Sequence, residues 1–136
     1  MASSLDIGDE IPRLETVLEP DQIRRYAVVA RLPGKRFVSD EVARKEGLPG
    51  QIVPGNMSMA LLSKMVLDWL PGARLEKLGV TFRGLVLPGK RIVGSGFVTD
   101  VRSRGGDTVV ECDLVLECDG ERRVTGMAVV AIAQRT

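Results

Sequence analysis

The strongest constraint on the fold is a single long apolar segment, residues 56–70. Its polar side chains are limited to Asn56, Ser58, Ser63, Lys64 and Asp68. An apolar surface around most of the circumference is typical of a buried helix. The segment is shorter than the roughly 18 apolar residues that are needed to span a bilayer. Because a Pro-Gly pair at 71–72 ends the pattern, we expect one buried helix that the rest of the chain covers.

The sequence after that helix has the two-residue period of β-strands, beginning with the alternating residues 78–86. Turn-forming residues interrupt the pattern at 88–90, 104–107 and 118–121, which predicts an antiparallel meander of four strands. The last strand, residues 123–133, is apolar on both faces. That pattern is expected for a strand in the middle of a sheet or beneath an interface.

Three shorter elements are predicted ahead of the apolar helix: a strand over residues 14–18, a helix over 19–30 and a short helix over 39–46. One long helix combined with one antiparallel sheet is an α+β arrangement. We therefore predict a hotdog fold, in which the antiparallel sheet wraps around a long central helix, as a single domain over residues 1–136. One such sheet leaves part of the helix and the last strand uncovered, so we also expect a dimer.

Charge and hydropathy exclude several classes of partner. The 19 Lys and Arg residues nearly balance the 18 Asp and Glu residues, which gives a formal net charge of +1. This balance argues against nucleic acid as a partner, because such proteins carry a clear basic excess. The first residues lack a basic start and an apolar signal core, so we expect a cytoplasmic protein without a membrane anchor.

Histidine is absent from all 136 residues. Histidine is the commonest general base near neutral pH and the commonest metal ligand, so any mechanism that requires a histidine from this chain is excluded, and we predict no metal site. The two cysteines, Cys112 and Cys118, fall in one predicted strand and would lie about 20 Å apart. They are therefore too distant to form a disulfide, and we expect buried free thiols.

Two runs of the sequence resemble the MaoC-like family of hotdog hydratases and dehydratases. Residues 43–58 read ARKEGLPGQIVPGNMS, and residues 80–90 read VTFRGLVLPGK. Family members typically carry A-R-x-x-G-L-P-G-x-I-x-H-G-M-x-(S/T) and V-x-F-x-x-P-V-x-P-G-D at this separation, with the central helix between them. The resemblance implies reversible addition of water across the α,β double bond of an acyl thioester on coenzyme A or acyl carrier protein.

In the family, a D-x-N-P-x-H motif upstream of the first run supplies an Asp and a His that activate water. Counted back from Gly47, the Asp position falls on Leu32 and the His position falls on Phe37. Neither side chain accepts a proton, and no shift of the alignment places a histidine there. The resemblance therefore implies a family member without the water-activating pair.

The other half of the family site is retained. Gly55 falls on the family's glycine at the start of the central helix, Ser58 falls on its small hydroxyl position, and Asn56 adds a polar group beside them. In the family, backbone N–H groups at this helix start polarise the thioester carbonyl. The alternative interpretation is that the three residues form only the turn and N-cap of the helix.

Further candidates lie outside these motifs. The Arg83 guanidinium is a candidate for binding the phosphates of coenzyme A or the acidic surface of acyl carrier protein, although an exposed arginine on a strand is more often only solvated. A carboxylate could replace the missing base, as in hotdog thioesterases. Asp40 and Glu41 are the nearest in sequence, but they also suit the first turn of the short helix. Asp68 lies about 18 Å along the helix.

From these observations we predict an acyl-thioester-binding subunit that acts as the non-catalytic half of an enoyl hydratase or 3-hydroxyacyl dehydratase. Its partner would be a second hotdog chain that supplies the Asp and His. Leu32, Phe37, Gly55, Asn56, Ser58 and Arg83 are the predicted substrate-binding residues. No cofactor is predicted beyond the thioester carrier. The alternatives are a homodimeric binding module without catalysis and a carboxylate-dependent thioesterase, and whether the chain is active alone is left open.

Overall fold

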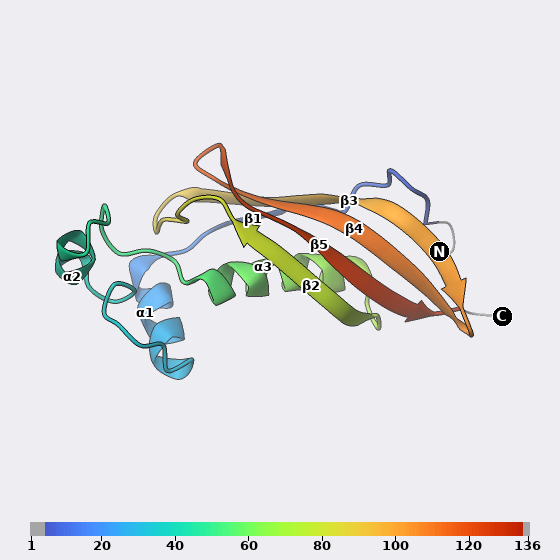
Figure 1. The fold of residues 1–136 in the computed structure, drawn as a ribbon, viewed down its shortest axis with the longest axis horizontal. Coiled ribbons are helices and arrows are strands. Elements are labelled where there is room, and N and C mark those ends of the chain that lie inside the picture. Colours follow the sequence, from blue (N-terminus) through green and yellow to red (C-terminus); the bar gives the residue numbers. More distant parts are fainter. Residues whose placement is uncertain (1–4, 135–136) are drawn as a thin grey trace.

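A five-stranded antiparallel sheet and one long helix make up most of the molecule, which is described for residues 5–134 of a computed structural model (Figure 1). The strands are β1 (Leu14–Val17), β2 (Arg74–Phe82), β3 (Arg91–Arg104), β4 (Asp107–Cys118) and β5 (Glu121–Ala133). The helices are α1 (Pro20–Val29), α2 (Asp40–Lys45) and α3 (Gly55–Trp69). This arrangement confirms the predicted α+β class and the sheet wrapped around a central helix.

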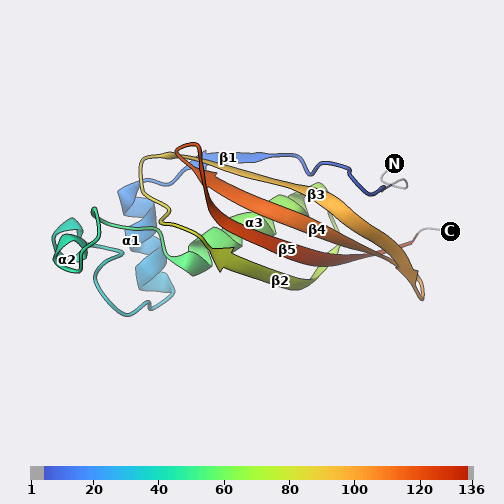
Figure 2. The same cartoon turned by 45° about the horizontal axis from the view of Figure 1, so that its top comes forward.

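The strand order is β1-β3-β4-β5-β2, as Figure 2 shows. The hairpins that join β3, β4 and β5 agree with the sequence pattern, but the predicted four-strand meander was wrong because β2 pairs with β5, with Leu78 opposite Ala128. The reason lies in the connections. Two residues join β3 to β4 and two join β4 to β5, whereas residues 83–90 are long enough to pass β5 and β4 and lead from the edge strand β2 to β3. The apolar β5 is thus an inner strand, as its pattern predicted.

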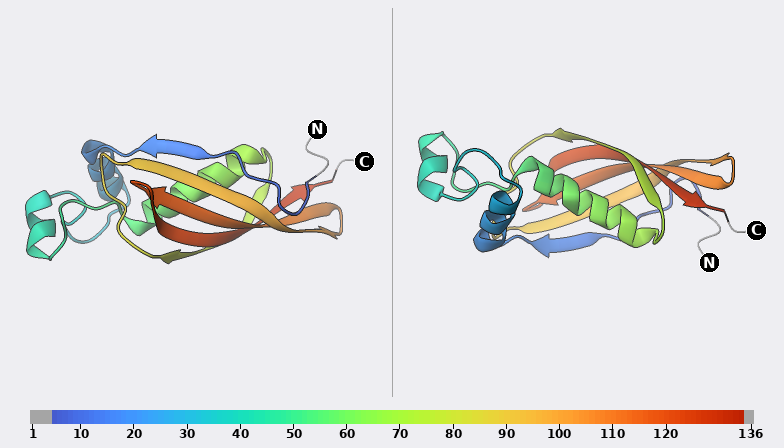
Figure 3. Two further views of the ribbon diagram at one scale, coloured as in Figure 1. Left: turned by 90° about the horizontal axis from the view of Figure 1, so that it is seen from above. Right: turned by 90° about the horizontal axis from the view of Figure 1, so that it is seen from below.

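α3 lies across one face of the sheet and forms the core with it (Figure 3). The inward residues of β4 are at most 1% exposed: Val110, Cys112, Leu114, Leu116 and Cys118. Gly94 of β3 brings the backbone close to the helix, since a Cβ there would lie 3.1 Å from Met65 Sδ. The sheet therefore buries one side of α3 along much of its length.

The other side of α3 is open, which differs from the all-round burial expected from the sequence. Asn56, Ala60, Lys64 and Asp68 recur at every fourth position and are exposed. Lys64 Nζ donates to Asp68 Oδ2 at 2.6 Å along this stripe. Three of the polar residues of the segment, Asn56, Lys64 and Asp68, lie on this solvent-facing stripe, because one sheet covers only the opposite side of the helix.

α1 and α2 lie beyond the end of the sheet where α3 begins (Figure 1). α1 begins with a capping box between Glu19 and Gln22, and the Ser39 side chain caps α2 by accepting from Val42 N–H at 3.2 Å. Both starts agree with the sequence. Within residues 5–134, no helix is long and apolar enough to cross a membrane.

Both cysteines are free and buried, as predicted. Burial, with smaller contributions from the carboxylates of Asp113 and Glu111, raises the pKa of the Cys112 thiol from its ordinary 9.0 to about 11. Cys118 Sγ lies 3.9 Å from the Leu87 carbonyl oxygen. Both positions belong to the core cluster.

We expect the native protein to resist thiol-specific reagents at pH 8 and both thiols to react after unfolding in guanidinium chloride. Since the folded pKa of Cys112 is raised, its effect on stability is absent below pH 9 and destabilising as the pH rises toward 11. Titration with a chromogenic disulfide reagent measures the first effect, and denaturant melts between pH 8 and pH 11 measure the second. Rapid labelling of the folded protein would contradict the burial of both thiols.

Candidate active site

Two backbone N–H donors at the start of α3 have no hydrogen-bond acceptor among the residues that the structure describes. Pro54 is the N-cap and has no side chain that can accept a hydrogen bond; its carbonyl accepts from the N–H groups of Met57 at 3.1 Å and Ser58 at 3.3 Å. Among the described residues, none accepts from the N–H of Gly55 or Asn56. Free N–H groups at the positive end of a helix dipole attract an oxygen that carries negative charge.

A phenylalanine ring lies directly against this helix start. A Cβ on Gly55 would lie 2.7 Å from Cζ of Phe82, the last residue of β2, so the ring occupies the space that any side chain at 55 would fill. Phe82 remains 52% exposed despite this contact. Sequence reasoning missed Phe82 as a site residue, because its place in the alternating strand pattern already explained it.

The structure separates the three residues predicted at the helix start. Gly55 is half-buried and Asn56 is exposed, whereas Ser58 is 1% exposed in the first turn of α3. The interpretation of these residues as the helix N-cap was wrong, because Pro54 holds that position without a side-chain hydrogen bond. Gly55 and Asn56 thus stand at the open end of the helix, with Ser58 behind them in the interior.

The residues predicted to stand at the family's Asp and His positions lie in the connection between α1 and α2. Both Leu32 and Phe37 are half-buried. The Leu32 N–H donates to the Ala27 carbonyl at 3.0 Å, which fixes it at the end of α1. The Phe37 carbonyl instead accepts from Gln51 Nε2 at 2.7 Å, so Phe37 lies beside the segment that leads into α3. No hydrogen bond within residues 5–134 joins Leu32 to that segment.

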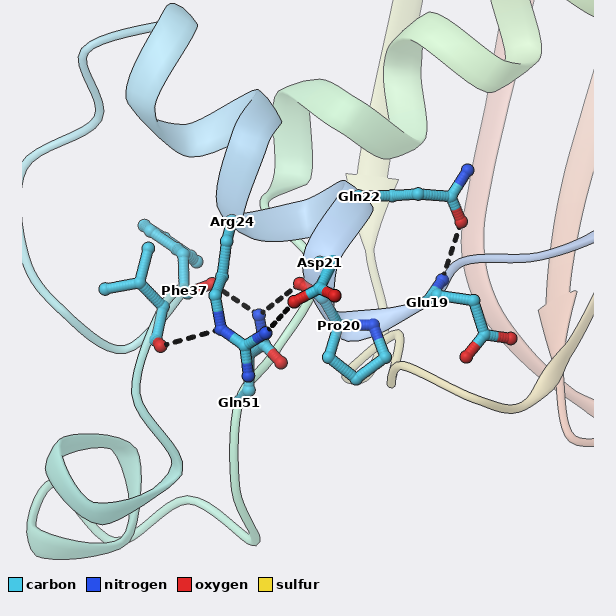
Figure 4. A network of polar contacts seen from close by, with 8 residues as sticks. Glu19, Pro20, Asp21, Gln22, Arg24, Phe37 and Gln51 are labelled. Carbon is cyan, nitrogen blue, oxygen red and sulfur yellow. Dashed lines mark hydrogen bonds and ion pairs between the residues drawn. The ribbon is translucent and has the colours of Figure 1, made fainter.

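Gln51 takes part in a network of polar contacts at this end of the molecule (Figure 4). The residue is 2% exposed. Its side-chain amide donates to the carbonyl of Phe37 and, at 3.1 Å, to the carbonyl of Pro20. Its own N–H donates to Asp40 Oδ1 at 2.7 Å. No pattern in the sequence indicates this role, since Gln51 stands at a variable position of the family motif and its hydrogen-bond partners come from distant segments.

The carboxylates considered as replacement bases are engaged elsewhere. Asp40 accepts from the Gln51 N–H, and Glu41 pairs with Lys45 at 3.5 Å on the surface of α2. Asp68 accepts from Lys64. These contacts are those expected of structural and surface carboxylates, and they favour the first-turn interpretation of Asp40 and Glu41 over the thioesterase alternative.

Arg83 directly follows Phe82 and is exposed. Its N–H donates to the Arg123 carbonyl at 2.7 Å, and its Nε donates to Thr125 Oγ1 at 3.3 Å. Thr125 lines a shallow groove on the sheet, which also includes Phe97 and Met127. The Arg83 guanidinium therefore points toward this groove, and its role in substrate binding stays a prediction.

The geometry supports binding of a carbonyl oxygen, and none of the described residues that the structure places at the helix start (Pro54, Gly55, Asn56 and Phe82) has a side chain that accepts a proton. The half-buried residues next to the helix start are apolar, and Asn56 is neutral at all ordinary pH values. Within residues 5–134, no three His, Cys, Asp or Glu side chains are grouped so that they could hold a metal ion. The arrangement can polarise a carbonyl group through helix N–H donors.

Comparison with known protein families agrees with the resemblance found in the sequence. The profile of the family described as MaoC like domain matches residues 6–117. No curated protein is similar enough in sequence to count as a match.

Several solved structures share the fold. The (R)-hydratase from A. caviae involved in PHA biosynthesis superposes with a TM-score of 0.85 at 22% identity, covering 95% of this chain and 98% of the hydratase chain. A chain of the ChsH1-ChsH2 complex from Mycobacterium tuberculosis gives 0.84 at 21% identity, with 95% and 98% covered. A chain of the C-terminally truncated HadBC (3R-hydroxyacyl-ACP dehydratase) complex from the same organism gives 0.81 at 19% identity, with 96% and 99% covered. These similarities confirm the hotdog fold.

The contact between Gly55 and Phe82 generates a prediction. Gly55→Ala should lower the free energy of unfolding more in the wild type than in a Phe82→Ala variant, because the added methyl group contacts the ring only when the ring is present. We expect the difference between these two effects, the coupling energy, to be about 1 kcal/mol. In the Phe82→Ala background the same change should be neutral or stabilising, since alanine favours a helix. Urea unfolding of the two single variants and the double variant measures the coupling. Additive effects would show that the ring does not rest on Gly55.

Proposed function

The chain belongs to the MaoC-like domain family, and on that premise we propose that it binds an acyl thioester as the non-catalytic half of an enoyl hydratase or 3-hydroxyacyl dehydratase. The observation that carries this proposal is the start of α3, where the N–H groups of Gly55 and Asn56 have no acceptor among the described residues and the Phe82 ring lies against Gly55. Such donors stabilise the negative charge that develops on a thioester carbonyl during addition or loss of water. The thioester is carried by coenzyme A or acyl carrier protein.

The absence of a base supports a non-catalytic role for this chain. Loss of a general base normally lowers a rate by about 10²–10⁴. Leu32 and Phe37 stand where the family has its Asp and His, and the chain contains no histidine that could replace them. We propose that a second hotdog chain supplies both groups, in a complex with this one.

Two of the similar structures support such a complex. One is described as the ChsH1-ChsH2 complex and the other as the HadBC complex, so both contain a chain with this fold within a complex. When one chain of a complex provides the acid and base, the other can lose them and still shape the substrate site. Apolar Leu32 and Phe37 then form part of a widened pocket, which suits a bulky acyl group.

The proposal is tested with purified protein and a panel of enoyl- and acyl-CoA esters, alone and after co-expression with candidate hotdog partners. We expect saturable thioester binding without turnover by the isolated chain, and hydration activity only in the complex. Native mass spectrometry establishes the composition of the complex. Hydration of enoyl thioesters by a stable homodimer would contradict the proposal, and release of free thiol would favour a thioesterase.

Restoring the missing pair provides a second prediction. The double substitution Leu32→Asp with Phe37→His should restore measurable hydration of crotonyl-CoA, because the carbonyl-binding half at Gly55 is unchanged. Since it places a charge in an apolar region, we expect a loss of several kcal/mol of stability unless the new pair forms a hydrogen bond. Hydration is followed by loss of enoyl absorbance, with each single variant as the control. A folded double variant that binds thioester but stays inactive would show that Leu32 and Phe37 do not occupy the family's Asp and His positions.

A further inference from the structure

The Phe82 ring contacts the start of α3 with its tip. A Cβ on Gly55 would lie 2.7 Å from Cζ, 3.1 Å from Cε1 and 3.2 Å from Cε2 of this ring. Because Cζ is the nearest atom and the two Cε atoms are almost equally distant, the axis from Cγ to Cζ points at Gly55. The two flat faces of the ring are therefore directed to either side of this contact and not onto the helix.

Much of the ring surface is accessible. Phe82 is 52% exposed, whereas Val124, its neighbour across the strand pair with β5, is 0% exposed. The tip of the ring is covered by Gly55, so an exposed fraction this large requires that at least one face of the ring is open. An open aromatic face thus stands beside the helix start, at the end of β2 (Figure 2).

This face lies within reach of a group bound at the helix start. The Gly55 N–H has no acceptor among the described residues. A carbonyl oxygen that accepted from it would lie about 3 Å from the nitrogen, and therefore no more than about 8 Å from the ring tip. The first carbons of an acyl chain extend about 4 Å from such a carbonyl, so the chain can lie along the ring.

We infer that Phe82 is a specificity-determining residue whose ring face stacks on the conjugated plane of an enoyl thioester, so that the site prefers unsaturated to saturated acyl groups. This inference rests on the proposed thioester function. Conjugation of the double bond with the carbonyl group holds the first carbons of an enoyl chain in one plane. Planar π-systems stack on an aromatic face in an offset arrangement, whereas the tetrahedral carbons of a saturated chain make only part of that contact.

The test compares crotonyl-CoA with butyryl-CoA, which have the same chain length and differ only in the double bond. Isothermal titration calorimetry gives both dissociation constants for the wild type and for Phe82→Leu, which keeps an apolar side chain without the ring. We expect the wild type to bind crotonyl-CoA more tightly, and this preference to fall by about fivefold in Phe82→Leu. Phe82→Ala should lose the preference to the same extent. Tyrosine is unsuitable at this position, because its hydroxyl group on Cζ would be directed at Gly55.

Phe97→Leu is the matched control. Phe97 is also a phenylalanine in a strand, and it is 47% exposed. It pairs with Asp113, whose neighbours Cys112 and Leu114 face the core, so it lies on the face of the sheet away from α3. Its replacement should leave the preference for crotonyl-CoA unchanged.

A measurement on the wild type tests the contact without relying on a variant to fold. Stacking predicts nuclear Overhauser effects between the ring protons of Phe82 and the vinyl protons of bound crotonyl-CoA. Their absence from a saturated complex would contradict the stacking role.

Failure of the proposed function and failure of this inference give different results. If the wild type binds neither ester, the proposed function is overturned and the role of Phe82 with it. If the wild type binds both esters without a preference, or if folded Phe82→Leu and Phe82→Ala keep the preference, the role of Phe82 is overturned and the proposed function stands. Equal weakening of both esters in these variants would show that the ring has only a structural role.

Discussion

The packing of α3 against one face of the antiparallel sheet determines where the candidate site lies. The inward rows of β3, β4 and β5 and the buried side of α3 form one continuous core, in which Leu62, Met65 and Val66 are nearly inaccessible. Because such interiors are close-packed, the helix cannot slide or rotate without opening cavities. The position of its first residue, and therefore of the free N–H groups at Gly55 and Asn56, is fixed by contacts that lie up to four turns away.

Two elements approach that helix start from different directions. Phe82 reaches it from the end of β2, and the connection carrying Phe37 is held beside the entering segment by Gln51. Neither contact is made within a single secondary-structure element. The candidate site is thus a meeting point of β2, the α1–α2 connection and α3, and its geometry depends on hydrogen bonds and ring contacts between segments that are distant in the chain.

The sequence predicted the parts of the fold that depend on local patterns. The period of two identified the strands, the apolar segment identified α3, and side chains such as Ser39 identified helix starts. A period shows which side chains share a face but does not show which strand is the neighbour, and for that reason the pairing of β2 with β5 was missed. The family motif identified Gly55 and Ser58, whereas Gln51 and Phe82 become site candidates only through tertiary contacts with residues that no local pattern connects to them.

The residues at the start of α3 support the proposed carbonyl-binding role over a purely structural one. A helix start with a purely structural role usually gains about 1 kcal/mol from a Ser, Thr, Asp or Asn side chain at the N-cap. The same chain uses that device at Ser39 for α2, a helix of only 6 residues, and uses the capping box at Glu19 for α1. At its longest and most deeply packed helix it has Pro54, which leaves the first donors unpaired among the described residues. A capping side chain would occupy the space in front of those donors, so its absence is expected where an oxygen atom of a ligand has to reach them.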